Sequence, residues 1–199
     1  MTIHTWWIFA ITVFLLSATP GPNMLHVLSR SVHWGLRRSI SAMAGCLTAL
    51  FVVLIISAAG MGALLSAIPG LFEVIKYLGA GYLIYLGIAA WRARKDHSAT
   101  DPEAEEITSR AGLSRLQLYR GGFFVGISNP KLLLFTVAFF PQFITLNAEV
   151  VPQYAILILT FMACESFWLV SYGLGGHGLS RILSGEKTGY PDYLVAMRN

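Results

Sequence analysis

The chain has 199 residues, of which 55% are hydrophobic and only 12% are charged, and its formal net charge is +4. A soluble domain has about 25% charged residues, so this composition excludes an ordinary soluble fold. The stretch 39–72 holds no charged side chain, and about 20 apolar residues suffice to cross a bilayer. We therefore expect an integral membrane protein of the all-α class.

Several functional classes find no support in the sequence. The basic residues are scattered at the ends of the apolar segments, which suits membrane topology better than a nucleic-acid surface. Cys46 and Cys164 lie apart within apolar segments, and the five histidines show no metal-ligand spacing. No nucleotide-binding loop, nucleophile elbow or metalloprotease motif occurs. We expect no catalytic residue, no metal and no cofactor, and hence no enzyme.

The first apolar segment, at about 6–28, is interrupted by Pro20, Gly21, Pro22 and Asn23. Each proline removes a backbone donor and clashes with the preceding turn, and glycine adds backbone freedom. In lipid such a break survives only where protein or a water-filled cavity satisfies the freed carbonyls. We interpret the break as a binding site for a polar solute, whose carboxylate would meet the N–H groups of the second half-helix. A purely structural kink is the alternative.

The first span ends at the expected cytoplasmic face with His26, Ser29 and Arg30. Arg30 is most simply a positive charge that fixes the orientation of the span. A gate formed by these three residues is the minority interpretation.

Two further spans are expected at about 40–65 and 71–91, joined by a short turn. The earlier one carries Ser41, Gly45 and Ala49, a series of small residues that lets another helix approach closely. A long polar connection follows at 92–120, where an acidic patch lies between basic residues. Such a composition is typical of a solvated linker and not of a catalytic site.

Span four, at 121–144, opens with Gly122-x-x-x-Gly126 and is broken at Asn129 and Pro130. Span five, at 151–174, contains Glu165 at a depth similar to that of Lys131. A charge inside a span costs at least ~2.5 kcal/mol on insertion scales, so a Lys131–Glu165 pair is expected to offset both. The pair is either a structural strut or a proton-coupling element.

The expected organisation has four parts. They are a first repeat at 1–91, a cytoplasmic linker at 92–120, a second repeat at 121–174 and a polar tail at 175–199 in which no sixth span can be drawn. Three spans separate the two helix breaks, so the second repeat enters the membrane from the opposite face, as in many secondary transporters. Nearly all Lys and Arg fall on one side, which predicts an outside N-terminus and a cytoplasmic C-terminus.

The motifs at the two breaks resemble those of the LysE/RhtB family of bacterial amino-acid exporters, in particular its homoserine/threonine efflux branch. The resemblance lies in Pro20-Gly21-Pro22-Asn23-Met24-Leu25 with Ser29-Arg30-Ser31, in Gly126-x-x-Asn129-Pro130-Lys131, and in Phe139-Phe140-Pro141-Gln142-Phe143. It implies export of small amino acids by proton antiport across a bacterial inner membrane. The family usually ends in another apolar segment, which the polar tail here does not match.

Three hypotheses follow. In the first, a secondary exporter binds the substrate carboxylate at the helix end near Asn23, with Asn129 as a hydrogen-bond partner and Lys131 and Glu165 balancing charge. In the second, a truncated relative does not transport and has an assembly or interaction role. The third, an intramembrane enzyme using Glu165 or His26, lacks a nucleophile–base pair. The substrate, the coupling ion and any homo-oligomer are left open by the sequence.

Overall fold

The computed structural model describes residues 1–67, 77, 81, 84, 85, 88, 113–145 and 148–187. Within these residues every regular element is a helix, which confirms the predicted all-α class. The elements are α1 (Ile3–Ala18), α2 (Pro22–Trp34), α3 (Leu36–Ala67), α6 (Arg115–Ile127), α7 (Pro130–Leu134), the π-helical η1 (Phe135–Phe139), the 3₁₀-helical η2 (Phe140–Phe143) and α8 (Val150–Lys187). The predicted third span lies outside the described residues apart from five single positions, as do the linker from 92 to 112 and the end of the tail.

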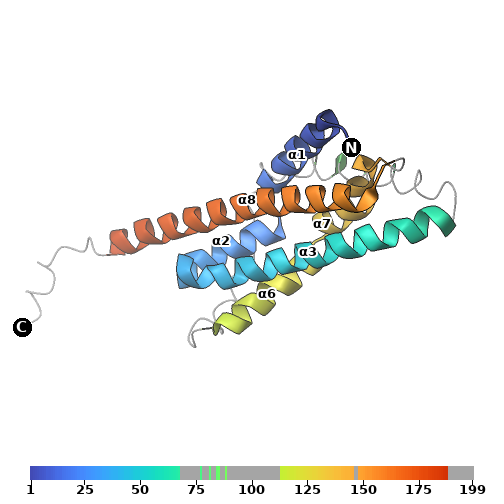
Figure 1. Cartoon of the computed structure of the whole chain (residues 1–199). Coiled ribbons are helices and arrows are strands. Elements are labelled where there is room, and N and C mark those ends of the chain that lie inside the picture. Colours follow the sequence, from blue (N-terminus) through green and yellow to red (C-terminus); the bar gives the residue numbers. More distant parts are fainter. Residues whose placement is uncertain are drawn as a thin grey trace, which may run out of the picture.

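Two helices are long and apolar enough to cross a membrane alone, over Leu36–Gly60 in α3 and Val150–Ser180 in α8. Two further spans pass the same test only as bent pairs. α1 and α2 meet at 49°, and α6 meets the α7–η2 segment at 48°. Both breaks therefore stand where the prolines predicted them, and the described part of the chain holds two to four candidate spans. Figure 1 shows α8 lying along α2, with α6 beneath α3.

The two breaks have the same local construction. α2 begins with Pro22 after an extended Gly21, and α7 begins with Pro130 after an extended Asn129. Proline suits the first position of a helix because its missing N–H would have no partner there. Asn129 also caps α7, since its Oδ1 accepts a hydrogen bond from the Lys131 N–H at 3.1 Å. Each break thus ends one helix and starts the next without unfolding the span.

Small residues hold α3 against α6, as the sequence predicted. A Cβ at Gly45 would collide with the Tyr119 carbonyl oxygen, and a Cβ at Gly122 would collide with the Ala42 carbonyl oxygen. At Gly126 it would lie only 2.6 Å from the Ala49 Cβ. The two backbones therefore touch directly, which fixes the start of the second broken span against an unbroken helix.

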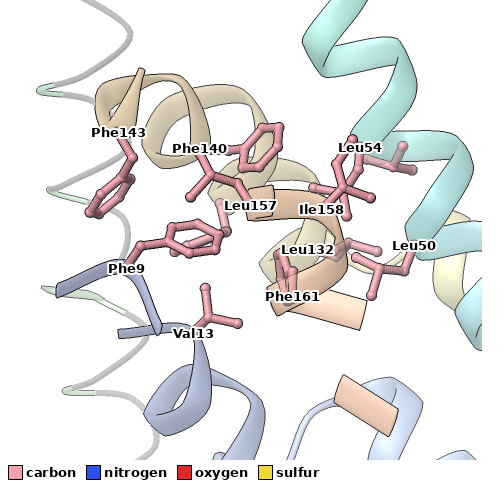
Figure 2. Packing of buried hydrophobic residues seen from close by; sticks show 12 residues of the cluster. Phe9, Val13, Leu50, Leu54, Leu132, Phe140, Phe143, Leu157, Ile158 and Phe161 are labelled. Atoms are coloured by element: carbon pink, nitrogen blue, oxygen red, sulfur yellow. The ribbon is translucent and has the colours of Figure 1, made fainter. Parts of the chain in front are cut away.

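An aromatic cluster packs α1 against η2, the last element of the second broken span. Phe9 is fully buried, and its ring lies 5.0 Å from the ring of Phe143 and 6.1 Å from that of Phe140. Figure 2 shows Phe9 and Val13 of α1 facing Phe161 and its neighbours on α8. The cluster forms one apolar side of the site described below.

Two helices extend beyond the predicted bounds of their spans. α6, the first helix of span four, begins at Arg115, where Ser114 and Gln117 form a capping box. α8 continues past 174 to Lys187, so the predicted polar tail begins as helix. Gly176 in this stretch is used for packing, because it lies against the Leu28 carbonyl of α2.

Candidate functional site

A small buried cavity lies where the two helix breaks meet α8, and its volume is about 10 Å³. This is room for roughly one water molecule. Its lining residues come from the first break (Leu16, Ser17, Gly21, Asn23 and Met24), from the second break (Asn129, Lys131 and Leu132) and from α8 (Phe161 and Glu165). Residues at both interrupted helices therefore line one shared cavity.

Glu165 and Asn23 form the acidic side of this cavity. Both are buried, with 8% and 2% of their surface exposed, and Asn23 Nδ2 donates to Glu165 Oε1 at 3.4 Å. The oxygen of this amide, Asn23 Oδ1, is buried and accepts no hydrogen bond from the described residues. Ser17 also faces the Glu165 carboxylate. The cavity therefore presents a carboxylate and an amide oxygen together, both able to accept hydrogen bonds.

Lys131 forms the basic side, and it closes the first break. Its Nζ donates to the carbonyl oxygens of Leu16 at 2.7 Å and of Thr19 at 2.9 Å. These carbonyls belong to the C-terminal end of α1, where the helix dipole is negative and a cation is favoured. The ammonium of the second broken span thus satisfies the carbonyl groups that the first break sets free.

Tyr172 of α8 supplies the remaining contact at the end of α1. Its hydroxyl donates to the Ala18 carbonyl at 3.0 Å, while the Thr19 N–H donates to the Leu16 carbonyl at 3.2 Å. Protein groups, and not lipid, therefore surround the exposed end of the helix, which is the condition for a broken helix in a membrane.

The expected Lys131–Glu165 pair takes a less direct form. Both side chains line the same cavity and each lies within the field of the other's charge. Their hydrogen bonds go to other partners, however: Lys131 binds the carbonyls of α1, and Glu165 binds Asn23. The two side chains therefore share one cavity, and within the described residues no hydrogen bond joins them directly.

The other predicted site residues separate into two groups. Pro20, Pro22 and Pro130 are exposed and do not line the cavity. Their role is to make the breaks. His26, Ser29 and Arg30, the candidate gate, lie further along α2 and do not line the cavity either. His26 packs instead beside the backbone of α6 at Gly121.

Sequence reasoning assigned no role to Ser17 or Tyr172. Ser17 is a buried polar residue just before the break, and that position was a usable signal. Tyr172 lies seven residues after Glu165 in the same helix, and this spacing places both side chains on one face.

A second, larger groove of about 550 Å³ lies between α3 and α8. Its lining is apolar, with Phe51 and Ile55 on one side and Ile158 and Leu159 on the other. It offers no charged group to a zwitterion, so the polar cavity is the site that suits a charged solute.

Comparisons with known proteins identify the family of the chain. A family model described as "LysE type translocator" matches residues 14–197. The homoserine/homoserine lactone efflux protein of Salmonella typhimurium is 32% identical over 187 residues, which cover 94% of this chain and 87% of that protein. An uncharacterised membrane protein of Vibrio cholerae is 32% identical over 172 residues, covering 86% of this chain and 80% of its own. No solved structure matches. The chain belongs to the LysE-type translocator family.

Proposed function

We propose that this protein is a secondary transporter that exports small amino acids or their derivatives, homoserine- or threonine-like, from the cytoplasm by proton antiport. The observation that carries the proposal is the shared cavity, in which two helix breaks, a buried carboxylate and a buried ammonium face one another. The efflux activity in the name of the Salmonella relative supports the amino-acid class. Homoserine and its lactone have the same α-amino group and differ in the carboxyl group, which is free in the first and esterified in the second.

The basic side of the cavity suits the carboxylate of a free amino acid. Gly21 and Asn23 place the N-terminal end of α2 on the cavity, and this end carries unpaired N–H groups and positive dipole. Lys131 Nζ has three donors, of which two bind α1, so the third can reach the carboxylate. Asn129 contributes its side-chain amide to the same wall.

Transport requires the site to open, because the cavity holds roughly one water and an amino acid is several times larger. The two bends are the natural places for this movement, since a break lets the halves of a span move separately. Glu165 is the acidic group on the cavity wall and is the proposed carrier of the coupling proton. The distribution of Lys and Arg supports an inner-membrane protein with its N-terminus outside.

Efflux from cells tests the proposal. Cells that express the protein are expected to release homoserine or threonine faster than cells with an empty vector, and Asn23→Ala is expected to lower this rate about ten-fold or more, since it removes a buried polar group from the cavity. Asn129→Ala removes both a helix cap and an amide from the cavity, whereas Asn129→Ser keeps a cap. A role in binding predicts that the serine variant folds normally and still exports slowly.

The non-transporting alternative predicts a different result. Intact protein at normal membrane levels would then export no amino acid, and the two asparagine variants would behave like the parent. That outcome would remove the transport assignment and leave an assembly or interaction role.

A further inference from the structure

We propose that Glu165 and the Oδ1 atom of Asn23 form the subsite that binds the α-ammonium group of the substrate. This inference rests on the proposed function. It adds an assignment of each end of the substrate to the residues of the cavity that bind it. It makes the ammonium, and not the carboxylate, the group on which recognition depends.

The first support is the unsatisfied oxygen of Asn23. The amide is 2% exposed, and its Nδ2 is turned toward Glu165, which leaves Oδ1 buried without a donor among the described residues. A buried acceptor without a hydrogen-bond donor is destabilising. Such atoms are therefore normally paired with a water molecule, an ion or a ligand. Because Asn23 lines the cavity, a guest in the cavity can supply that partner.

The second support is the combination of groups. Glu165 stands beside Asn23 at 3.4 Å, so a donor placed in the cavity meets a carboxylate and an amide oxygen together. A primary ammonium carries one positive charge and three N–H donors, and therefore suits a charged and a neutral acceptor at once. A carboxylate placed there would face the buried Glu165 charge and find no donor on Oδ1.

The third support is that Lys131 and Glu165 have different partners on the cavity lining. Lys131 Nζ is held by the carbonyls of Leu16 and Thr19, whereas Glu165 accepts a hydrogen bond from Asn23, so the two ends of a zwitterion would meet separate groups. A zwitterion then has one orientation, with its ammonium toward α8 and its carboxylate toward the helix N-termini. A lactone keeps the contact of its ammonium group and loses only the interaction of a free carboxylate with the helix N-termini.

Competition in proteoliposomes tests this assignment. Full-length protein would exchange labelled L-homoserine or L-threonine in the presence of L-homoserine lactone, which has only the ammonium, or 4-hydroxybutanoate, which has only the carboxylate. The lactone is expected to compete, and 4-hydroxybutanoate is expected to need a concentration about ten-fold higher or more, the effect of one charge-assisted hydrogen bond. Equal competition by 4-hydroxybutanoate would overturn the subsite while leaving the proposed function intact. If neither amino acid exchanges, the proposed function fails and the subsite fails with it.

Two glutamine variants provide the matched comparison. Glu165→Gln keeps the shape and the acceptor for Asn23 but removes the charge, and is expected to raise the homoserine concentration needed for half-maximal exchange about ten-fold. It should also reduce the preference for the lactone over 4-hydroxybutanoate to about two-fold, a change that a merely structural role would not produce. Glu149→Gln, at an exposed glutamate before α8, should change neither. Ligand-induced shifts in unfolding temperature give the same comparison without turnover, and an unchanged preference in Glu165→Gln contradicts the assignment.

Discussion

Replacing Gly45 by alanine is expected to push α3 and α6 apart and to lower the free energy of unfolding by about 3 kcal/mol, the upper range for overpacking. The cost is large because the new Cβ would meet the backbone of the facing helix at Tyr119, and backbone cannot rotate away as a side chain can. Gly122→Ala is expected to behave alike, since its Cβ meets the Ala42 carbonyl. The measurement is the unfolding temperature of protein purified in detergent, together with its level in the membrane.

Gly60 provides the control on the same helix. Among the described residues, a Cβ at Gly60 meets nothing within 4 Å, so Gly60→Ala adds a methyl group without a collision there. Alanine is the better helix former by about 1 kcal/mol, so this variant should be as stable as the parent or slightly more stable. If Gly45→Ala and Gly60→Ala unfold at the same temperature, the close approach of α3 and α6 is not what holds this pair of helices.

Lys131→Met is the second change with a large expected effect. It removes the side-chain donor to the Thr19 carbonyl and one of two donors to the Leu16 carbonyl, which keeps the Thr19 N–H; a group left unsatisfied costs about 1–3 kcal/mol. It also leaves Glu165 without a cation across the cavity. We expect the unfolding temperature to fall and amino-acid efflux to drop below detection. Tyr172→Phe removes one neutral hydrogen bond from the same helix end and should cost only about 1 kcal/mol.

A double variant separates the two functions of Lys131. Because Glu165 balances its charge, Lys131→Met with Glu165→Gln should lose less stability than the sum of the single changes. It should not return to the parent value, because the Leu16 and Thr19 carbonyls still lack the Lys131 ammonium. Strict additivity would show that the two charges do not interact. Arg115→Met, at an exposed cation that starts α6, should leave stability and efflux unchanged.

The breaks and the cavity were predictable because they follow from covalent chemistry. Pro22 and Pro130 cannot continue a helix, and the carbonyls that they release need polar surroundings in a membrane. That argument predicts polar surroundings at each of the two helix ends without any knowledge of packing. Gly45 was informative for a similar reason. A glycine among small residues in a membrane helix predicts that another helix packs closely there, although it does not identify that helix.

The partners of individual side chains were not predictable in the same way. Opposite charges suggested that Lys131 binds Glu165, yet Lys131 binds the carbonyls of α1 because an unpaired helix end competes for the same ammonium. The helix of α8 also continues beyond the predicted span, and Gly176 in this stretch packs against the Leu28 carbonyl of α2, a contact that the sequence alone does not show. Both points concern tertiary contacts, which local sequence does not encode.

Because α8 is a single continuous helix, its two ends are expected to move together. Its 38 residues extend about 57 Å, more than the thickness of the hydrocarbon core. Glu165 and the exposed Ile182 stand on this one rod, about 26 Å apart along its axis. If substrate binding at Glu165 tilts α8, we expect Ile182 to move with it, because both residues lie on one continuous helix.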